Sequence, residues 1–186
     1  GLGIGIACAG LIFLWVEDEV SFDNNNVKKD RIFLVKTNAK VDDGVFTHSS
    51  TAGPMAPAIK ATIPGIANTC RTTEDGTSFL FAIGDKSVNA SGEYVEPSFF
   101  NMFTLPFIEG NASSAFAQLH SIVLTQKTAK KFFGDEKNIL GKTVRMDNKQ
   151  DYVVSGILQD LPENSTIQFE WLAPFKVWYD DNPRAA

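Results

Sequence analysis

Residues 1–16, GLGIGIACAGLIFLWV, decide how the chain is organised, and the acidic residues Glu17, Asp18 and Glu19 follow them at once. These sixteen residues carry no charge and no strongly hydrogen-bonding side chain, so the segment gains free energy by leaving water. A helix of this length covers roughly 24 Å, which is short of the roughly 30 Å hydrocarbon core of a bilayer. Because the sequence begins with Gly instead of Met, we interpret it as the outer end of a transmembrane helix whose beginning is missing.

Two features of this segment predict its role in a membrane. Small residues at Gly1, Gly5 and Ala9 have the spacing that lets helix backbones approach closely in lipid, so we expect a helix that packs against another helix. The side chains that we expect to be embedded in lipid are Leu11, Ile12, Phe13, Leu14, Trp15 and Val16. A buried helix of a soluble protein and a signal peptide are the alternatives. The signal peptide is disfavoured because the apolar run continues beyond the small residues at 7–9.

The composition describes a folded, acidic remainder. A hydrophobic fraction of 44% with 15 Phe residues is typical of a globular chain and excludes disorder for most of it. Residues 17–186 are long enough for one ordinary domain or two small lobes that share a core. The net charge of -5 offers no basic stripe for a phosphate backbone, so we predict no nucleic-acid partner. Acidic residues directly after the apolar segment fit a non-cytoplasmic side.

The residue types that carry chemistry are sparse and scattered. Cys8 and Cys70 cannot assemble a disulfide framework or a zinc site, and neither His48 nor His120 has a ligand residue at metal-binding spacing. No serine lies in a G-x-S-x-G motif. The carboxylates cluster only in local runs at residues 17–19, 42–43 and 180–181. We therefore predict a non-enzymatic protein with no catalytic, cofactor-binding or metal-binding residues.

Local patterns predict most of the regular structure. Residues 31–36, RIFLVK, have the apolar density of a strand buried on both faces, with residues 45–48 as a possible partner, and residues 54–62 have the proline pattern of a short helix. SFLFAIG and SVNASGEYV predict a hairpin, and residues 96–103 a helical turn. Residues 105–114 are expected to form a loop.

The second half of the chain contains the clearest unit. SIVLT at residues 121–125 predicts a buried strand, followed by a helix over residues 126–133 that Thr125 caps and Gly134 ends. Residues 142–146 are expected to pair with residues 152–158 across the turn Asp147-Asn148. The string GKT at residues 141–143 ends like a P-loop, but the spacing to Gly134 is wrong and a strand, not a helix, follows it.

Several longer segments stand in an order that is more specific than any one of them. They are residues 1–16 running into EDEVSFD and DRIFLVK, then TAGPMAPAIKATIPGI, then EPSFFNMFTLPFIEG, and then SIVLTQKTAKKFFGDEKNILGKTVRMDNKQDYVVSGILQDLPENS. Together they resemble the first membrane helix and the following outer domain of the MacB/FtsX-type permeases of ABC transporters, in the form found in Bacteroidetes. The resemblance covers most of residues 1–167.

The resemblance implies an α+β fold, a mixed-sheet periplasmic core domain over residues 17–186 that is incomplete at its C-terminus. It implies the end of a transmembrane helix over residues 1–16 and an inserted hairpin-rich lobe at about residues 66–114. The chain would lie in the bacterial inner membrane with residues 17–186 facing the periplasm. The implied partners are a cytoplasmic ABC ATPase, a second copy or related permease subunit, a periplasmic adaptor or lipoprotein, and the lipid bilayer.

The implied function is to transmit ATP-driven conformational change across the membrane, for export or for lipoprotein and cell-envelope processes, while a separate subunit or domain hydrolyses the ATP. We expect residues 31–36 to form a stiff strand that carries movement of the helix into the domain through a stalk at residues 20–30. The alternatives are a membrane-anchored ligand-binding or sensor domain, which predicts a deep lined pocket, and a secreted hydrolase, which predicts a polar triad in that pocket.

Overall fold

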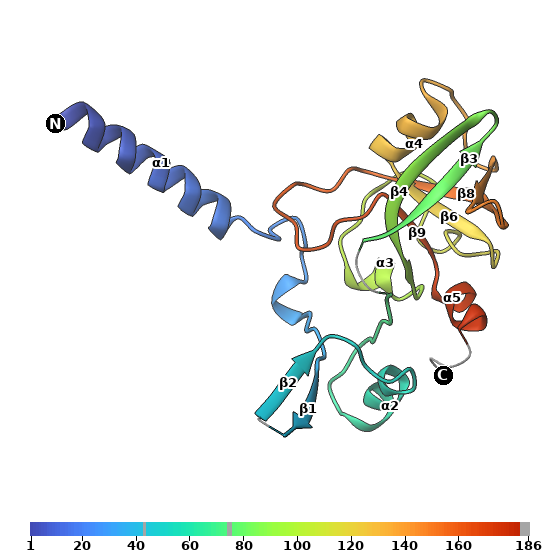
Figure 1. Ribbon diagram of the computed structural model, residues 1–186, viewed down its shortest axis with the longest axis horizontal. Coiled ribbons are helices and arrows are strands. Elements are labelled where there is room, and N and C mark those ends of the chain that lie inside the picture. Colours follow the sequence, from blue (N-terminus) through green and yellow to red (C-terminus); the bar gives the residue numbers. More distant parts are fainter. Residues whose placement is uncertain (43, 74–75, 183–186) are drawn as a thin grey trace.

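The computed structural model describes residues 1–42, 44–73 and 76–182, and Figure 1 shows three parts. Helix α1 projects from the rest, a strand-paired body lies at the other end, and a smaller arm with β1, β2 and α2 extends from the body. The helices are α1 (Leu2–Val20), α2 (Met55–Thr62), α3 (Phe99–Met102), α4 (Gln126–Phe133) and α5 (Phe175–Asp181), with a 3-10 turn at Lys29–Arg31. The strands are β1 (Thr37–Val41), β2 (Gly44–His48), β3 (Thr77–Ile83), β4 (Lys86–Val95), β5 (Phe107–Glu109), β6 (Ser121–Thr125), β7 (Thr143–Met146), β8 (Gln150–Leu158) and β9 (Trp171–Pro174).

The body is one mixed sheet whose strands run in the order β5-β8-β6-β9-β4-β3-β7. Strand β4 pairs with β9, and β6 with β8, in parallel, whereas the other neighbours are antiparallel. Strand β7 also pairs with β8, so the pairings return on themselves and form a closed ring. The mixed sheet with helices confirms the α+β prediction.

The unit at residues 121–134 forms as its sequence predicts. All five residues of β6 are buried, because both faces of this strand are covered: Ile122 and Leu124 belong to one buried cluster and Val123 to another. The Thr125 hydroxyl accepts a hydrogen bond from the Thr128 backbone N–H at 3.3 Å and so caps α4, while Gly134, at φ 66°, ends the helix. Ala129 and Phe132 turn the apolar side of α4 into the core. The charged side of the helix is left in solvent.

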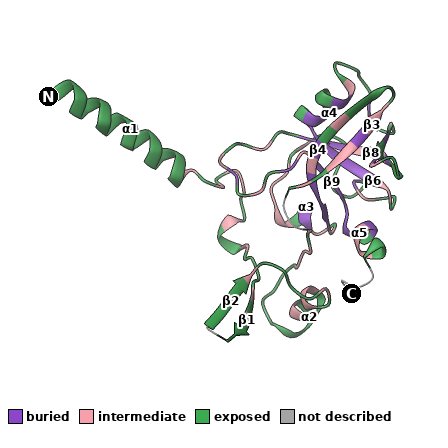
Figure 2. Ribbon diagram, in the orientation of Figure 1, coloured by how far each residue is buried: buried purple, intermediate pink, exposed green. Residues whose placement is uncertain are grey.

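Trp171 lies at the centre of the main core. It is fully buried, its ring centroid lies 5.3 to 5.9 Å from those of Phe79, Phe81 and Tyr94, and its indole N–H donates to the Ala90 carbonyl at 3.0 Å. Figure 2 shows burial concentrated on the strands of the body. A second buried cluster contains Val95, Phe99, Ala115, Val123, Leu158, Phe169 and Leu172. The sheet lies between the two clusters. The clusters also contain residues of α3, α4 and α5, so these helices pack on the sheet.

Both predicted hairpins in the body form. Asp147 and Asn148 have φ of 51° and 54°, left-handed conformations within the short turn that connects Met146 of β7 to its partner Gln150 of β8. Strands β3 and β4 pair from Thr77–Gly92 to Ile83–Lys86. They belong to the same sheet as β6, β8 and β9. The inserted lobe at about residues 66–114 stays a prediction.

Three expectations from the sequence were wrong. Residues 31–36 do not form a strand: Arg31 ends the 3-10 turn, and residues 32–36 are largely exposed and pair with no described strand. The partner of β2 is therefore β1. Strand β5 forms inside the loop that we expected at residues 105–114.

Helix α1 and the arm differ from the body in their exposure. No residue of α1 or α2 is buried, and Figure 2 shows both almost entirely exposed or intermediate. Among the described residues, no helix combines the length and the apolar character needed to cross a membrane. The placement of residues 1–16 in lipid stays a prediction.

Candidate functional site

The candidate site is the junction between α1 and the body, residues 21–28 on one side and residues 101–104 and 161–170 on the other. Ser21 ends α1, since its backbone N–H donates to the Glu17 carbonyl at 3.0 Å and its hydroxyl donates to the Asp18 carbonyl at 2.9 Å. The chain then turns at Asp23, which has φ of 58°. This left-handed residue directs the chain away from the helix axis and onto the body.

Asp23 is the main contact of the junction. Its carboxylate accepts hydrogen bonds from the Thr166 backbone N–H at 2.7 Å, from the Ser165 hydroxyl at 3.3 Å and from the Thr166 hydroxyl. Its own backbone N–H donates to the Asn164 carbonyl at 2.9 Å, and the Asn164 amide donates to the Ser21 hydroxyl at 2.8 Å. Side chain and backbone together attach the end of α1 to the segment before β9.

The environment of Asp23 favours its charged form. Burial by itself raises the pKa of this carboxyl, but the hydrogen bonds from Thr166 and Ser165 and the charge of Lys29 outweigh burial, so the pKa is lowered from its ordinary value of 3.8. The contact is therefore formed by a carboxylate at neutral pH, and such charge-assisted hydrogen bonds are stronger than neutral ones.

A second contact attaches the stalk to α3 and to the residues that follow it. The Val27 backbone N–H donates to the Thr104 hydroxyl at 3.1 Å, and the Lys28 ammonium donates to the Asn101 carbonyl. Residues 21–28 are therefore held at two places on the body.

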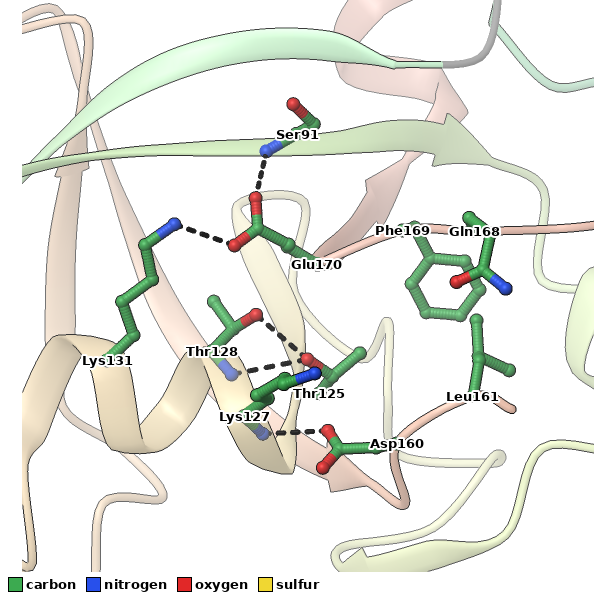
Figure 3. A pocket seen from close by; sticks show the side chains of 10 residues that line it. All are labelled: Ser91, Thr125, Lys127, Thr128, Lys131, Asp160, Leu161, Gln168, Phe169 and Glu170. Carbon is green, nitrogen blue, oxygen red and sulfur yellow. Dashed lines mark hydrogen bonds and ion pairs between the residues drawn. The ribbon is translucent and has the colours of Figure 1, made fainter. Parts of the chain in front are cut away.

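The segment held by Asp23 continues into Glu170, which links three elements (Figure 3). The Glu170 carboxylate accepts from the Ser91 backbone N–H of β4 and forms an ion pair with the Lys131 ammonium of α4, both at 2.7 Å. The Glu170 carbonyl accepts from the Thr125 backbone N–H at 3.1 Å at the end of β6. Residues 164–166 are thus connected, through the four residues 167–170, to β4, β6 and α4.

A hollow of about 540 Å³ lies around these residues and opens to solvent. Figure 3 shows its polar side chains directed at one another, with Asp160 accepting from the Lys127 backbone N–H at 2.7 Å and Thr125 bonded to Thr128. Lys131 and Glu170 are paired with each other. Among the residues that line this hollow, no nucleophile lies beside a base.

The predicted site residues all lie on α1. Gly1, Gly5 and Ala9, and the six residues 11–16, are exposed in this structure, and nothing lies within 4 Å of a Cβ placed on Gly1 or Gly5. Their roles in helix packing and in lipid stay predictions. Among the described residues, no cluster of His, Cys, Asp and Glu has the arrangement of a metal site. Asp43, named among the acidic runs, lies outside the described residues, as do residues 183–186 of the predicted domain.

The two histidines and Cys70 lie partly inside the protein. His48 stacks on Phe46 with centroids 5.8 Å apart, and His120 meets Tyr152 edge-on at 5.5 Å. Both histidines are half-buried. Burial raises the pKa of the Cys70 thiol to about 11.

Sequence reasoning missed the residues of the junction. Residues 23–26, DNNN, and 163–166, ENST, are clusters of side chains that bond to nearby backbone, and this composition is typical of ordered turns. That signal marks each segment as a turn. It carries no information that the two turns meet.

The comparison with protein families matches residues 1–183 to the MacB-like periplasmic core domain. The chain belongs to this family. As a MacB-like periplasmic core domain, it is part of an ABC transporter permease-type protein and lies on the periplasmic or extracellular side of the membrane. Domains of this family are generally not catalytic themselves.

Solved structures of permease domains have the same fold. A domain of a putative permease protein from Porphyromonas gingivalis matches with a TM-score of 0.73 and 28% identity, over 87% of this chain and 69% of that one. The periplasmic region of MacB from Actinobacillus actinomycetemcomitans matches at 0.51 and 21%, over 68% and 56%. The extracellular domain of the noncanonic ABC-type transporter YknZ from Gram-positive bacteria matches at 0.55 and 15%, over 72% and 67%. The MacB-like domain described here therefore spans little more than half of the MacB periplasmic region. A comparison with curated proteins gives no match.

Proposed function

We propose that this MacB-like domain transmits ATP-driven movement from a membrane helix to the outer face of a permease subunit. The observation that carries the proposal is the contact of Asp23 with residues 164–166, because it attaches the end of α1 to a segment that leads directly to β4, β6 and α4. Chains of packed and hydrogen-bonded residues of this kind carry energetic coupling between elements. The exposed segment at residues 31–36 cannot serve as the stiff connection, so the junction takes that role.

The setting of this function follows from the family. Residues 1–16 would lie in the bacterial inner membrane with residues 17–186 in the periplasm, and a cytoplasmic ABC ATPase would supply the energy. A second copy or a related permease subunit would complete the machine, with a periplasmic adaptor or a lipoprotein as a further partner. The movement would serve export or a lipoprotein or cell-envelope process. The uncharged surface of residues 1–16 supports the membrane part of this proposal.

The test uses the full permease together with its ATPase and needs no knowledge of the substrate. Hydrogen exchange of residues 161–170 is measured with and without ATP, in the native permease and in a variant with a flexible Gly/Ser insert between Val20 and Ser21. We expect an ATP-dependent change in exchange in the native protein. The insert should abolish that change while ATP hydrolysis continues.

The matched control carries the same insert in the exposed turn between Gly84 and Asp85, which lies outside the junction. We expect this control to keep the ATP-dependent change. Retention of the change in the Val20 insert would overturn the proposal, as would its absence from the native protein.

A further inference from the structure

The arm, residues 32–66, is joined to its neighbours mainly by backbone. Among the described strands, β1 and β2 pair only with each other, and no residue of α2 is buried. The chain enters the arm after the 3-10 turn at Lys29–Arg31 and leaves it through the irregular residues 67–70. Hinge movements occur at loop connections of this kind, so the orientation of the arm depends on the side chains that hold it.

Arg71 lies where the arm meets the body. Strands β4 and β9 run in parallel and end side by side, so Glu96 and Phe175 leave the sheet at the same place. The chain that returns from the arm passes this place, because Thr72 bridges to Val95 and the Glu96 backbone N–H donates to the Arg71 carbonyl at 3.1 Å. The Arg71 side chain therefore starts next to both strand ends.

Glu96 fixes the Arg71 side chain in position. The Glu96 Oε1 atom accepts from Nε and Nη2 of the guanidinium at 2.9 and 2.7 Å, and Oε2 accepts from the Arg71 backbone N–H at 2.9 Å. The exposed fractions of the two side chains are only 27% and 25%, so water competes less for these bonds than it does at an exposed ion pair. The guanidinium is thus held in a defined orientation.

The fixed guanidinium contacts the arm and α5 at the same time. Its Nη1 atom, which does not bond to Glu96, donates to the Gly53 carbonyl of the arm at 3.3 Å. Its Cζ atom lies 4.9 Å from the ring centroid of Phe175 and 5.3 Å from that of Tyr179, both in α5. A cation at these distances is attracted to an aromatic ring. Figure 1 shows α5 on the side of the body from which the arm extends.

We propose that Arg71 is the positioning residue of the arm and sets its orientation relative to β4, β9 and α5. Among the described residues, the bond from Arg71 to Gly53 is the one hydrogen bond between residues 32–66 and the residues beyond 70. The planar guanidinium suits this role, because it can bond to Glu96 with two nitrogens and reach Gly53 with the third, whereas the ammonium of Lys is a single point charge.

The test measures the distance between arm and body in the full-length permease, in lipid nanodiscs and without nucleotide. Spin labels are attached in Ser49→Cys of the arm and Ser87→Cys of β4, both at exposed positions, with Cys8→Ser and Cys70→Ala as the background. Double electron–electron resonance gives the width of the distance distribution, and dilution with unlabelled copies suppresses signals between two molecules. A second label pair, Ser87→Cys with Lys137→Cys, reports on the body alone.

Arg71→Met keeps the length of the side chain but removes its donors and its charge. We expect it to broaden the arm-to-body distribution about twofold and to leave the pair within the body unchanged. Arg71→Lys should give an intermediate width, because it restores the ion pair with Glu96 but not the bond to Gly53. The matched control is Arg145→Met, which removes an arginine from an ion pair of the same 2.7 Å length with Asp151 and should not change the width.

A native width in Arg71→Met would overturn the proposal, because other contacts would then hold the arm. Equal broadening in Arg145→Met would also overturn it, since the effect would not be specific to Arg71. Broadening of the pair within the body would show that Arg71 holds the body together and does not position the arm. Because the measurement uses no nucleotide, its outcome is independent of the proposed transmission function.

Discussion

Asp23 and Thr166 are joined by two hydrogen bonds, from the Thr166 backbone N–H at 2.7 Å and from its hydroxyl, although 143 positions separate them in the sequence. The bond attaches the first turn after α1 to the segment that leads into β9, the strand that lies between β6 and β4. A contact between such distant parts of the sequence makes the orientation of α1 depend on the body.

Replacing Asp23 with Asn should weaken this junction. The amide keeps the size of the side chain but loses the charge that strengthens the bonds from Thr166, which we expect to cost about 1 kcal/mol after allowance for solvent. Hydrogen exchange at residues 164–166 should become several-fold faster, while exchange in the buried strand β6 should not change. Thr166→Val removes only the hydroxyl bond, so it should have the smaller effect. Equal exchange in the native protein and in Asp23→Asn would contradict the role of the carboxylate.

The same junction should loosen in acid. The pKa of Asp23 is lowered in the folded protein, so its stabilising effect is present above the ordinary value of 3.8 and is lost as the pH falls through the lower folded value. We expect exchange at residues 164–166, corrected for the intrinsic rate, to rise below that pH in the native protein. In Asp23→Asn the corrected rate should be independent of pH over this range. An identical pH profile in the two proteins would show that another group is responsible.

Gly92 is required by the approach of Trp171. A Cβ at position 92 would lie 2.5 Å from the ring atom Cδ2 of Trp171, which is fully buried and cannot move away. Gly92→Ala should therefore lower the free energy of unfolding by about 1–3 kcal/mol, as overpacking of a core does. Urea unfolding followed by Trp fluorescence measures this. Ser87→Ala, at an exposed position of the same strand, is the control and should leave the midpoint nearly unchanged.

Thr125 should contribute to stability through its cap on α4. Thr125→Ala removes the acceptor for the Thr128 N–H and should cost about 1 kcal/mol in urea unfolding. Thr125→Ser retains the hydroxyl and should recover most of this loss. If Ser and Ala were equally destabilising, the effect would come from the lost methyl group and not from the cap.

Cys70 should be a poorly reactive thiol. Because burial raises its pKa to about 11, almost all of it is protonated near neutral pH, and the thiolate is the reactive form. In a Cys8→Ser variant, modification by iodoacetamide at pH 8 should be slow in the folded protein and fast in urea. The folded pKa lies above the ordinary value of 9.0, so this group stabilises the fold fully below that value, and the effect is lost as the pH rises towards about 11. Equal rates in buffer and in urea would contradict burial of the thiol.

The parts of the fold that were predictable depend on neighbours in the sequence. The strand, cap and helix of residues 121–134 follow from the alternation of residue types and from Thr125 and Gly134 at its boundaries. The turn at Asp147-Asn148 follows from two residues that tolerate positive φ. In each case the deciding interactions span only a few residues.

The parts that were not predictable depend on distant pairings. Residues 31–36 have the composition of a buried strand, but composition cannot supply the neighbouring strand that would bury them. The short strand β5 forms because it pairs with the edge of β8 near Leu158. Nothing in the sequence of residues 107–109 predicts that pairing. The junction depends on a contact between Asp23 and Thr166, and a single sequence does not indicate which distant residues are in contact.

The position of β9 affects how the domain is made. Ribosomes release residues 171–174 after the other strands that the structure describes, yet β6 and β4 have β9 between them in the ring. Until those residues emerge, β6 and β4 each have an unpaired edge. Phe79, Phe81 and Tyr94 also lack their contact with the Trp171 ring. The ring of strands therefore cannot close during synthesis until β9 has left the ribosome.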